Sequence, residues 1–123
     1  MRTLVHAGAP DAPHRLLALL PGSYSEPEDF MRHGFVEAAV SHRIADEIVA
    51  VELRAAWFAD GSIVERLVEH LVRPARARGY EQVAIAGISI GALSALAFAA
   101  RHESDVESLV LIAPYPCARD VLR

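Results

Sequence analysis

The sequence predicts an α/β fold in which a mostly parallel sheet of about four to five strands lies between two layers of helices. Short apolar runs rich in β-branched residues alternate with longer segments whose apolar residues recur at helical spacing. Clusters of Gly, Pro and Asp separate these segments. The 123 residues are 53% hydrophobic and 23% charged, which is typical of one globular domain over residues 1–123.

The first half of the chain predicts two strands and a helix. Residues 3–6 form a short first strand, and the apolar run 16–20 forms a second strand that Pro21 and Gly22 end. Ser25 is a candidate N-cap and Pro27 fits a first helical turn, so a helix is expected over about 27–41.

The second half predicts three more strands, which alternate with two helices. A helix over about 62–78 has the apolar spacing of an amphipathic helix, although Pro74 should kink or split it, and Gly79 is a candidate C-cap. The remaining helix is expected over 90–102, and the three strands are expected over 47–53, 82–86 and 106–113.

The motif Gly87-Ile88-Ser89-Ile90-Gly91 lies where the strand over 82–86 is expected to lead into the helix over 90–102. A serine at such a junction lies on a tight turn, and glycines flank it because larger side chains would meet the neighbouring strand and helix. The free N–H groups of the helix N-terminus would point at the Ser89 hydroxyl. The alternative is an ordinary Gly/Ser turn without chemistry.

With this motif, the order of elements from about Leu16 to Pro116 resembles the N-terminal portion of an α/β-hydrolase, and thus a truncated form of that fold. The resemblance implies that Ser89 is the nucleophile and that the Ile90 N–H contributes to an oxyanion hole. The second donor would come from the loop after Pro21, where Ser23 is favoured and Tyr24 is the near alternative. Pro21 stands where many members of the family have a histidine.

A complete catalytic triad is not evident in the sequence. The only histidine after Ser89 is His102, which ends the helix that Ser89 opens and would lie about 20 Å away, too far to be the general base. A histidine at a helix C-terminus instead stabilises the helix dipole. Asp120 is a poor match to the acid. Two explanations remain open: the acid and histidine lie beyond Arg123, or the chain is a reduced relative that has lost catalysis. The first explanation is favoured, because a sheet that ended at the last strand would leave a buried-type, apolar strand as an exposed edge. Pairing of that edge in a homodimer or with a partner chain is therefore expected.

Composition excludes several classes of function. The net charge of −4 without a basic patch argues against nucleic-acid binding. A metal site is not expected, because the chain has a single cysteine, Cys117, and its histidines lack the spacing of metal ligands. Residues Gly87–Gly91 lack the lysine and the glycine pattern of phosphate-binding loops, so no cofactor is expected. No apolar run approaches the roughly 20 residues that span a bilayer, and no signal peptide is visible, which favours a cytoplasmic location.

The function expected from these observations is hydrolysis of a small ester or thioester by acyl transfer to Ser89. Tyr24 is expected to contact the substrate, and the other aromatic candidates for the pocket are Trp57, Phe58 and Tyr115. The competing hypothesis is a non-catalytic α/β module that binds a ligand or a partner through the same crevice.

Overall fold

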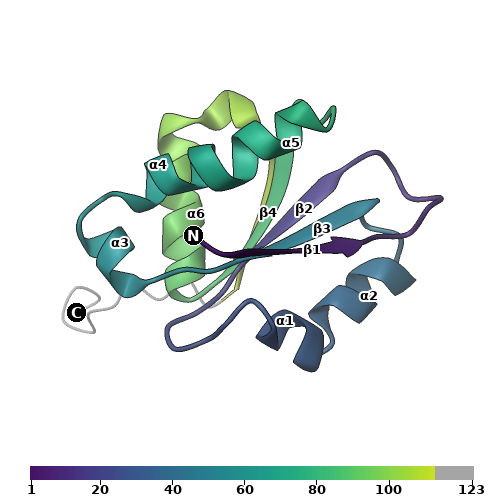
Figure 1. Ribbon diagram of the computed structural model, residues 1–123, viewed down its shortest axis with the longest axis horizontal. Helices are drawn as coiled ribbons and strands as arrows, with labels where there is room; N and C mark the ends of the chain where they lie inside the picture. Colours follow the sequence, from purple (N-terminus) through teal and green to yellow (C-terminus); the bar gives the residue numbers. More distant parts are fainter. Residues whose placement is uncertain (113–123) are drawn as a thin grey trace.

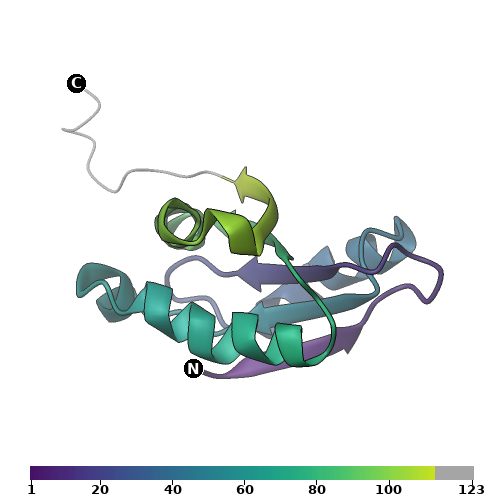
Figure 2. The same cartoon turned by 90° about the horizontal axis from the view of Figure 1, so that it is seen from above.

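A five-stranded sheet forms the centre of the computed structural model, which describes residues 1–112. The order across the sheet is β1-β3-β2-β4-β5, with β1 antiparallel to β3 and the other neighbours parallel. Figure 2 shows β1 and β5 at the two opposite edges. The strands are β1 Thr3–Ala7, β2 Leu16–Leu20, β3 Glu47–Val51, β4 Val83–Ile88 and β5 Val106–Ile112. The predicted α/β class, the mostly parallel sheet and the strand count are confirmed.

Helices cover both faces of this sheet (Figure 1). On one face α1 (Asp29–Arg32) and α2 (Phe35–Ser41) pack against alternate residues of the central strands. On the other face lie α3 (Ala55–Ala59), α4 (Ile63–Leu67), α5 (Arg73–Ala77) and α6 (Ile90–Arg101). A short 3₁₀ helix, Glu103–Asp105, leads into β5. The three layers follow because a parallel sheet buries apolar side chains on both faces.

Strand β2 is the centre of both hydrophobic cores. All five of its residues are buried, which explains why its sequence is a continuous apolar run rather than an alternating one. Leu16, Ala18 and Leu20 belong to the core under α4 and α6, whereas Leu17 and Leu19 belong to the core under α1 and α2. The end of β2, which leads into Pro21, is therefore held firmly from both sides.

The single helix predicted over 27–41 is wrong, because two short helices occupy this segment. Gly34 separates them with φ of +82°, a left-handed conformation that glycine adopts without a steric cost. Ser25 does not cap α1 as expected. Its backbone N–H instead donates to Gly22 O at 3.2 Å, and the N–H of Glu26 donates to the Asp29 carboxylate at 2.8 Å.

The helix predicted over 62–78 is present from Ile63 to Ala77, with a π-helical turn at Val68–Val72 directly before α5. The wider turn accommodates the Pro74 ring, which lacks an N–H and would crowd the preceding turn of an α-helix. Gly79 follows the C-terminus with φ of +93°, as expected for its predicted role. Helix α3 was not predicted, and β3 ends at Val51 rather than Leu53.

Strand β5 is exposed along its outer edge and on one face, since β4 is its only partner among residues 1–112. Leu109 and Leu111 pack against the core under α6, but Val110 and Ile112 on the opposite face remain 55% and 41% exposed. No helix in the described part of the chain is long and apolar enough to cross a membrane. The expectations for Ala113, Pro114-Tyr115-Pro116, Cys117 and Asp120 concern residues outside the described range.

Candidate functional site

Ser89 lies between the last residue of β4 and the first residue of α6. Its backbone has φ of +55° and ψ of −116°, which an L-residue adopts only at a cost of about 1–3 kcal/mol. The N–H of Ser89 donates to Ile112 O at 2.9 Å, and Ser89 O accepts from the N–H of Ala92 at 2.9 Å. Strand β5 and the first turn of α6 therefore hold the strained residue in place.

Gly87 and Gly91 flank Ser89 where backbone segments pass too close for a side chain. A Cβ at Gly87 would lie 2.5 Å from Gly91 O, and one at Gly91 would collide with Leu20 O and lie 2.7 Å from Pro21 O. These contacts bring the first turn of α6 directly against the end of β2. The structure thus gives the steric reason that was expected for both glycines.

A second turn, Gly22–Ser25, follows β2 and faces Ser89. A Cβ built on Gly22 would lie 3.6 Å from the Cβ of Ser89, so the two turns are in van der Waals range. The turn is closed by the bond from Ser25 N–H to Gly22 O, and Tyr24 has φ of +62°. This is the arrangement of a type II turn, in which the N–H groups of the two central residues, Ser23 and Tyr24, make no part of the closing bond. The Tyr24 side chain is fully exposed.

Two hollows flank the Gly22–Ser25 turn. The first, called the small cavity below, has a volume of about 90 Å³ and is lined by Gly22 together with Pro21, Phe30, Phe35 and Ile88. His33 and Asp29 also border it. The second, called the open hollow, has a volume of about 380 Å³. It is lined by Ser23, Glu26 and Arg54 together with Tyr24, Ser25, Leu53 and Ala55.

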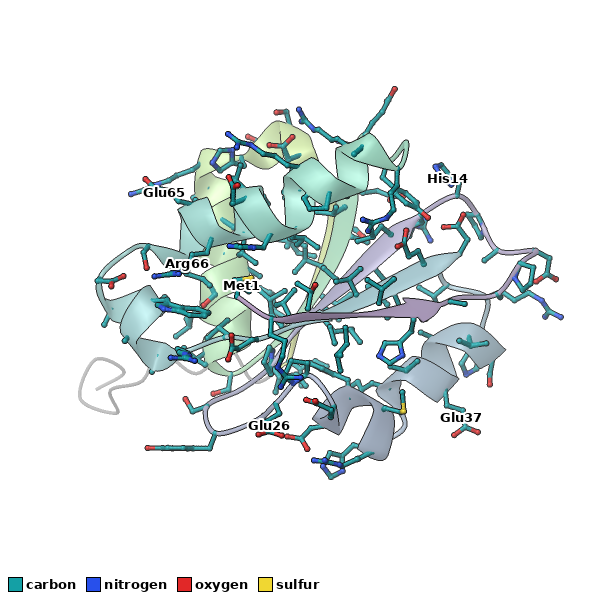
Figure 3. The ribbon with its side chains drawn as sticks, in the orientation of Figure 1. Met1, His14, Glu26, Glu37, Glu65 and Arg66 are labelled. Carbon is teal, nitrogen blue, oxygen red and sulfur yellow. The ribbon has the colours of Figure 1, made fainter. Side chains whose placement is uncertain are left out.

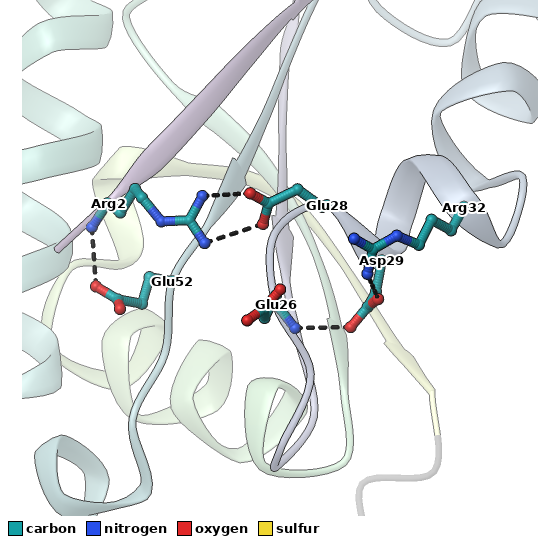
Figure 4. Close-up of polar contacts among 6 residues, drawn as sticks. All are labelled: Arg2, Glu26, Glu28, Asp29, Arg32 and Glu52. Carbon is teal, nitrogen blue, oxygen red and sulfur yellow. Dashed lines mark hydrogen bonds and ion pairs between the residues drawn. The ribbon is translucent and has the colours of Figure 1, made fainter.

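An ion-pair network fixes the segment that joins the Gly22–Ser25 turn to α1 (Figure 4). The two terminal guanidinium nitrogens of Arg2, Nη1 and Nη2, donate to the Glu28 carboxylate at 2.5 and 2.9 Å. This bidentate pair lowers the pKa of Glu28 to about 2. Asp29 in turn accepts from the N–H of Glu26 and from Arg32, and the backbone bond to Glu26 is the main cause that lowers its pKa.

No histidine or carboxylate among residues 1–112 is hydrogen-bonded to the Ser89 hydroxyl. His102 follows the C-terminus of α6, where it stacks on Phe98 at 5.1 Å and lies 3.4 Å from Asp105. It therefore lies at the far end of the helix that Ser89 precedes, as expected. Within the same described range, no three His, Cys, Asp or Glu side chains are grouped as metal ligands.

The aromatic residues proposed for the pocket lie in different places. Trp57 and Phe58 belong to α3 and pack partly buried against the core, and the Arg66 guanidinium stacks over Trp57 at 4.3 Å. The rings beside the Gly22–Ser25 turn are instead Phe30 and Phe35, which contact edge to face at 5.5 Å. This pair could not be predicted from the sequence as long as residues 27–41 were expected to form one helix.

A further polar cluster surrounds Asp46 at the opposite end of the sheet, and Figure 3 shows His14 far from Glu26. Asp46 accepts from His14 at 2.9 Å and from the Tyr80 hydroxyl at 2.8 Å, and the His14 and Tyr80 rings stack at 4.2 Å. The bond to Asp46 and a second one to Gly79 O raise the pKa of His14. This cluster joins three loops and lies away from Ser89.

No protein-family model and no curated protein matches the sequence. Solved structures do match: a carboxylesterase from Bacillus subtilis has a TM-score of 0.65 and 22% identity over 98% of this chain and 43% of its own. A CIB-like hydrolase from Thermoplasma acidophilum has a TM-score of 0.65 and 16% identity over 91% of this chain and 57% of its own. An α/β hydrolase from a deep-sea metagenome library has a TM-score of 0.59 and 21% identity over 89% of this chain and 39% of its own.

These similarities show the fold. The chain has an α/β-hydrolase-like architecture that corresponds to an N-terminal portion of the fold, and it spans about two fifths to three fifths of the length of these three proteins. The resemblance stated from the sequence is confirmed at this level.

Proposed function

We propose that this chain carries the nucleophile of a serine hydrolase that cleaves a small ester or thioester. The observation that supports this most strongly is the backbone of Ser89, which is a strained, non-glycine residue at a strand-to-helix junction. Strain of this kind persists only where the surrounding structure enforces it, and it is typical of functional sites. The half-buried Ser89 remains within reach of solvent.

In the proposed reaction the Ser89 Oγ attacks the acyl carbon, and the carbonyl oxygen becomes an oxyanion. The N–H of Ile90, the first residue of α6, has no partner within its own helix and is one donor to this charge. Ser23 N–H is the second donor, with Tyr24 N–H as the alternative. Collapse of the tetrahedral intermediate expels the alcohol or thiol, and water then releases the acid from the acyl-serine.

A general base must take the proton of Ser89, and we propose that it comes from outside residues 1–112. Without it a serine hydroxyl is a weak nucleophile. A competing function therefore deserves a direct test: a non-catalytic module that binds a ligand or partner through the same crevice. The unpartnered Ser89 hydroxyl within the described range favours this second candidate.

Covalent labelling by a fluorophosphonate probe, followed by intact mass on the folded chain, separates the two functions. The hydrolase predicts one adduct that Ser89→Ala removes. A variant at Ser94, a buried serine of α6, should retain the adduct when it is changed to Ala. A folded wild-type chain without an adduct would favour the binding module.

A change at Ser23 tests the oxyanion donor separately from the nucleophile. Ser23 is the second residue of the Gly22–Ser25 turn, a position that proline favours in type II turns, so Ser23→Pro removes the N–H and is compatible with the turn. Loss of one such donor lowers the rate by about 100- to 1000-fold. Ser23→Ala keeps the N–H and should react like the wild type. Equal labelling of the Pro and Ala variants would move the donor to Tyr24.

A further inference from the structure

The small cavity beside Ser89 has the character of a binding site for an apolar group. Its apolar walls are formed by Pro21 and by the side chains of Phe30, Phe35 and Ile88, which come from three separate elements. The polar residues Ser25, Asp29 and His33 also line it. Pro21 and Phe30 are buried, and the edge-to-face contact of Phe30 with Phe35 makes one wall aromatic. Apolar walls with few polar groups are typical of small-molecule sites.

The cavity lies beside the Gly22–Ser25 turn that faces Ser89, although Ser89 itself does not line it. Gly22 is one of its lining residues, and a Cβ on Gly22 would be 3.6 Å from both Ser89 Cβ and Ile88 O. A group bound to the acyl carbon at Ser89 therefore has a short path past Gly22 into the cavity. The open hollow on the other side of the turn is about four times larger, at about 380 Å³, and includes Glu26 and Arg54.

We propose that the small cavity binds the acyl chain of the substrate and limits it to about four carbon atoms, while the open hollow receives the alcohol or thiol. This rests on the proposed function of Ser89. The limit follows from volume: a cavity of about 150 Å³ in another protein holds the six carbons of benzene, so about 90 Å³ holds about four. Each methylene that enters should raise kcat/KM about fourfold, and methylenes beyond the limit should add nothing.

Phe35 is the residue best suited to test the limit. It is 37% exposed, so Phe35→Ala lengthens the cavity toward solvent without opening a hole in the core, as Phe30→Ala would. Met31 is an exposed apolar residue of the adjoining helix that does not line the cavity, and Met31→Ala is the matched control.

The first experiment measures hydrolysis of 4-nitrophenyl acetate, butanoate, hexanoate and octanoate by the full chain. We expect kcat/KM to rise to butanoate and then to stop rising in the wild type and in Met31→Ala, and to rise further to hexanoate in Phe35→Ala. A continued rise to octanoate in the wild type, or the same profile in Phe35→Ala, would overturn the acyl-chain assignment.

A second measurement separates this inference from the proposed function, since it needs no reaction. The Ser89→Ala chain is titrated with methyl butanoate and with methyl octanoate while the methyl resonances of Ile88 are followed by NMR. The inference predicts that both esters shift these resonances with similar midpoints, and that adding Phe35→Ala lowers the midpoint for octanoate but not for butanoate. If no ester is hydrolysed but this binding pattern holds, the function of Ser89 fails and the cavity assignment stands. Resonances that do not respond to butanoate would refute the assignment.

Discussion

Gly91→Ala tests whether the close approach of α6 to β2 is as tight as the structure implies. Helix propensity alone predicts that alanine stabilises a helix by about 1 kcal/mol relative to glycine. The geometry predicts the opposite, because the new Cβ would collide with Leu20 O and lie 2.7 Å from Pro21 O. Both atoms belong to the backbone at the end of the most deeply buried strand, where neither has room to yield.

The magnitude follows from these two opposing effects. Ordinary contacts of a Cβ begin at about 3.4 Å, so the Pro21 O contact alone requires α6 to move by about 0.7 Å, and the closer Leu20 O requires more. Overpacking of this kind costs about 3 kcal/mol at the upper end of its range. Subtracting the gain in propensity leaves a loss of about 2 kcal/mol. With an unfolding entropy of about 2.1 cal/mol/K per residue over 123 residues, this corresponds to a fall in Tm of about 8 °C.

Thermal unfolding followed by circular dichroism measures this change. Gly22→Ala is the matched control, because its Cβ would make ordinary contacts of 3.6 Å, and its Tm should stay within about 2 °C of the wild type. A Tm for Gly91→Ala at or above that of the wild type would show that the first turn of α6 is free to shift, and the steric explanation of the second glycine would be wrong.

Three further predictions concern other parts of the chain. Tyr24→Gly should keep or raise stability, by up to about 1 kcal/mol, because it relieves a φ of +62° at a fully exposed side chain; a loss of stability in denaturant unfolding would contradict this. The same change should slow labelling of Ser89, because Tyr24 is expected to contact the substrate. The pKa of His14 is raised in the folded state, so its protonation stabilises the fold below the unfolded pKa of 6.5, and this contribution is lost as pH rises through the folded pKa. The Tm of the wild type should therefore fall with rising pH more steeply than the Tm of His14→Gln. Parallel curves would exclude the ion pair of His14 with Asp46. Strand β5 contains no Lys or Pro to block pairing along its edge, so two copies of the chain should form a dimer in sedimentation, and Val110→Lys should dissociate it. A monomeric wild type would refute this pairing.

The sequence was sufficient to predict the sheet and the position of Ser89, because both depend on local patterns. A continuous apolar run indicates a strand that is buried on both faces, and β2 was found so. Glycines beside a serine indicate close approach of backbone segments, and Gly87 and Gly91 were found so. The extension of β4 to Ile88 was not predicted, since Gly87 and Ile88 lack the pattern of the preceding run.

What the sequence did not indicate depends on contacts between distant segments. The small cavity needs Phe30 and Phe35 to be turned toward Ile88, and the break at Gly34 that separates their helices was missed although glycine is a known break signal. The ion pair between Arg2 and Glu28 joins residues 26 positions apart, so no local pattern in the sequence predicts it. The cytoplasmic location, the single domain over 1–123 and the pairing through the last strand stay predictions. So do the roles assigned to Ser89, Ser23, Tyr24 and Ile90.

The strand order also has a consequence for the time at which Ser89 takes up its position. In the register of the sheet β2 pairs with β4 through Leu16 and Val83, which lie 83 − 16 = 67 residues apart, so a long loop must close before the central pair forms. Pairings of such high sequence separation are formed slowly compared with helices. The strained turn at Ser89 follows β4, and its N–H donates to Ile112 O at the end of β5. The turn is therefore completed only after this slow loop closure. On the proposed function of Ser89, labelling of its hydroxyl in a refolding chain would then report that β2, β4 and β5 have been assembled.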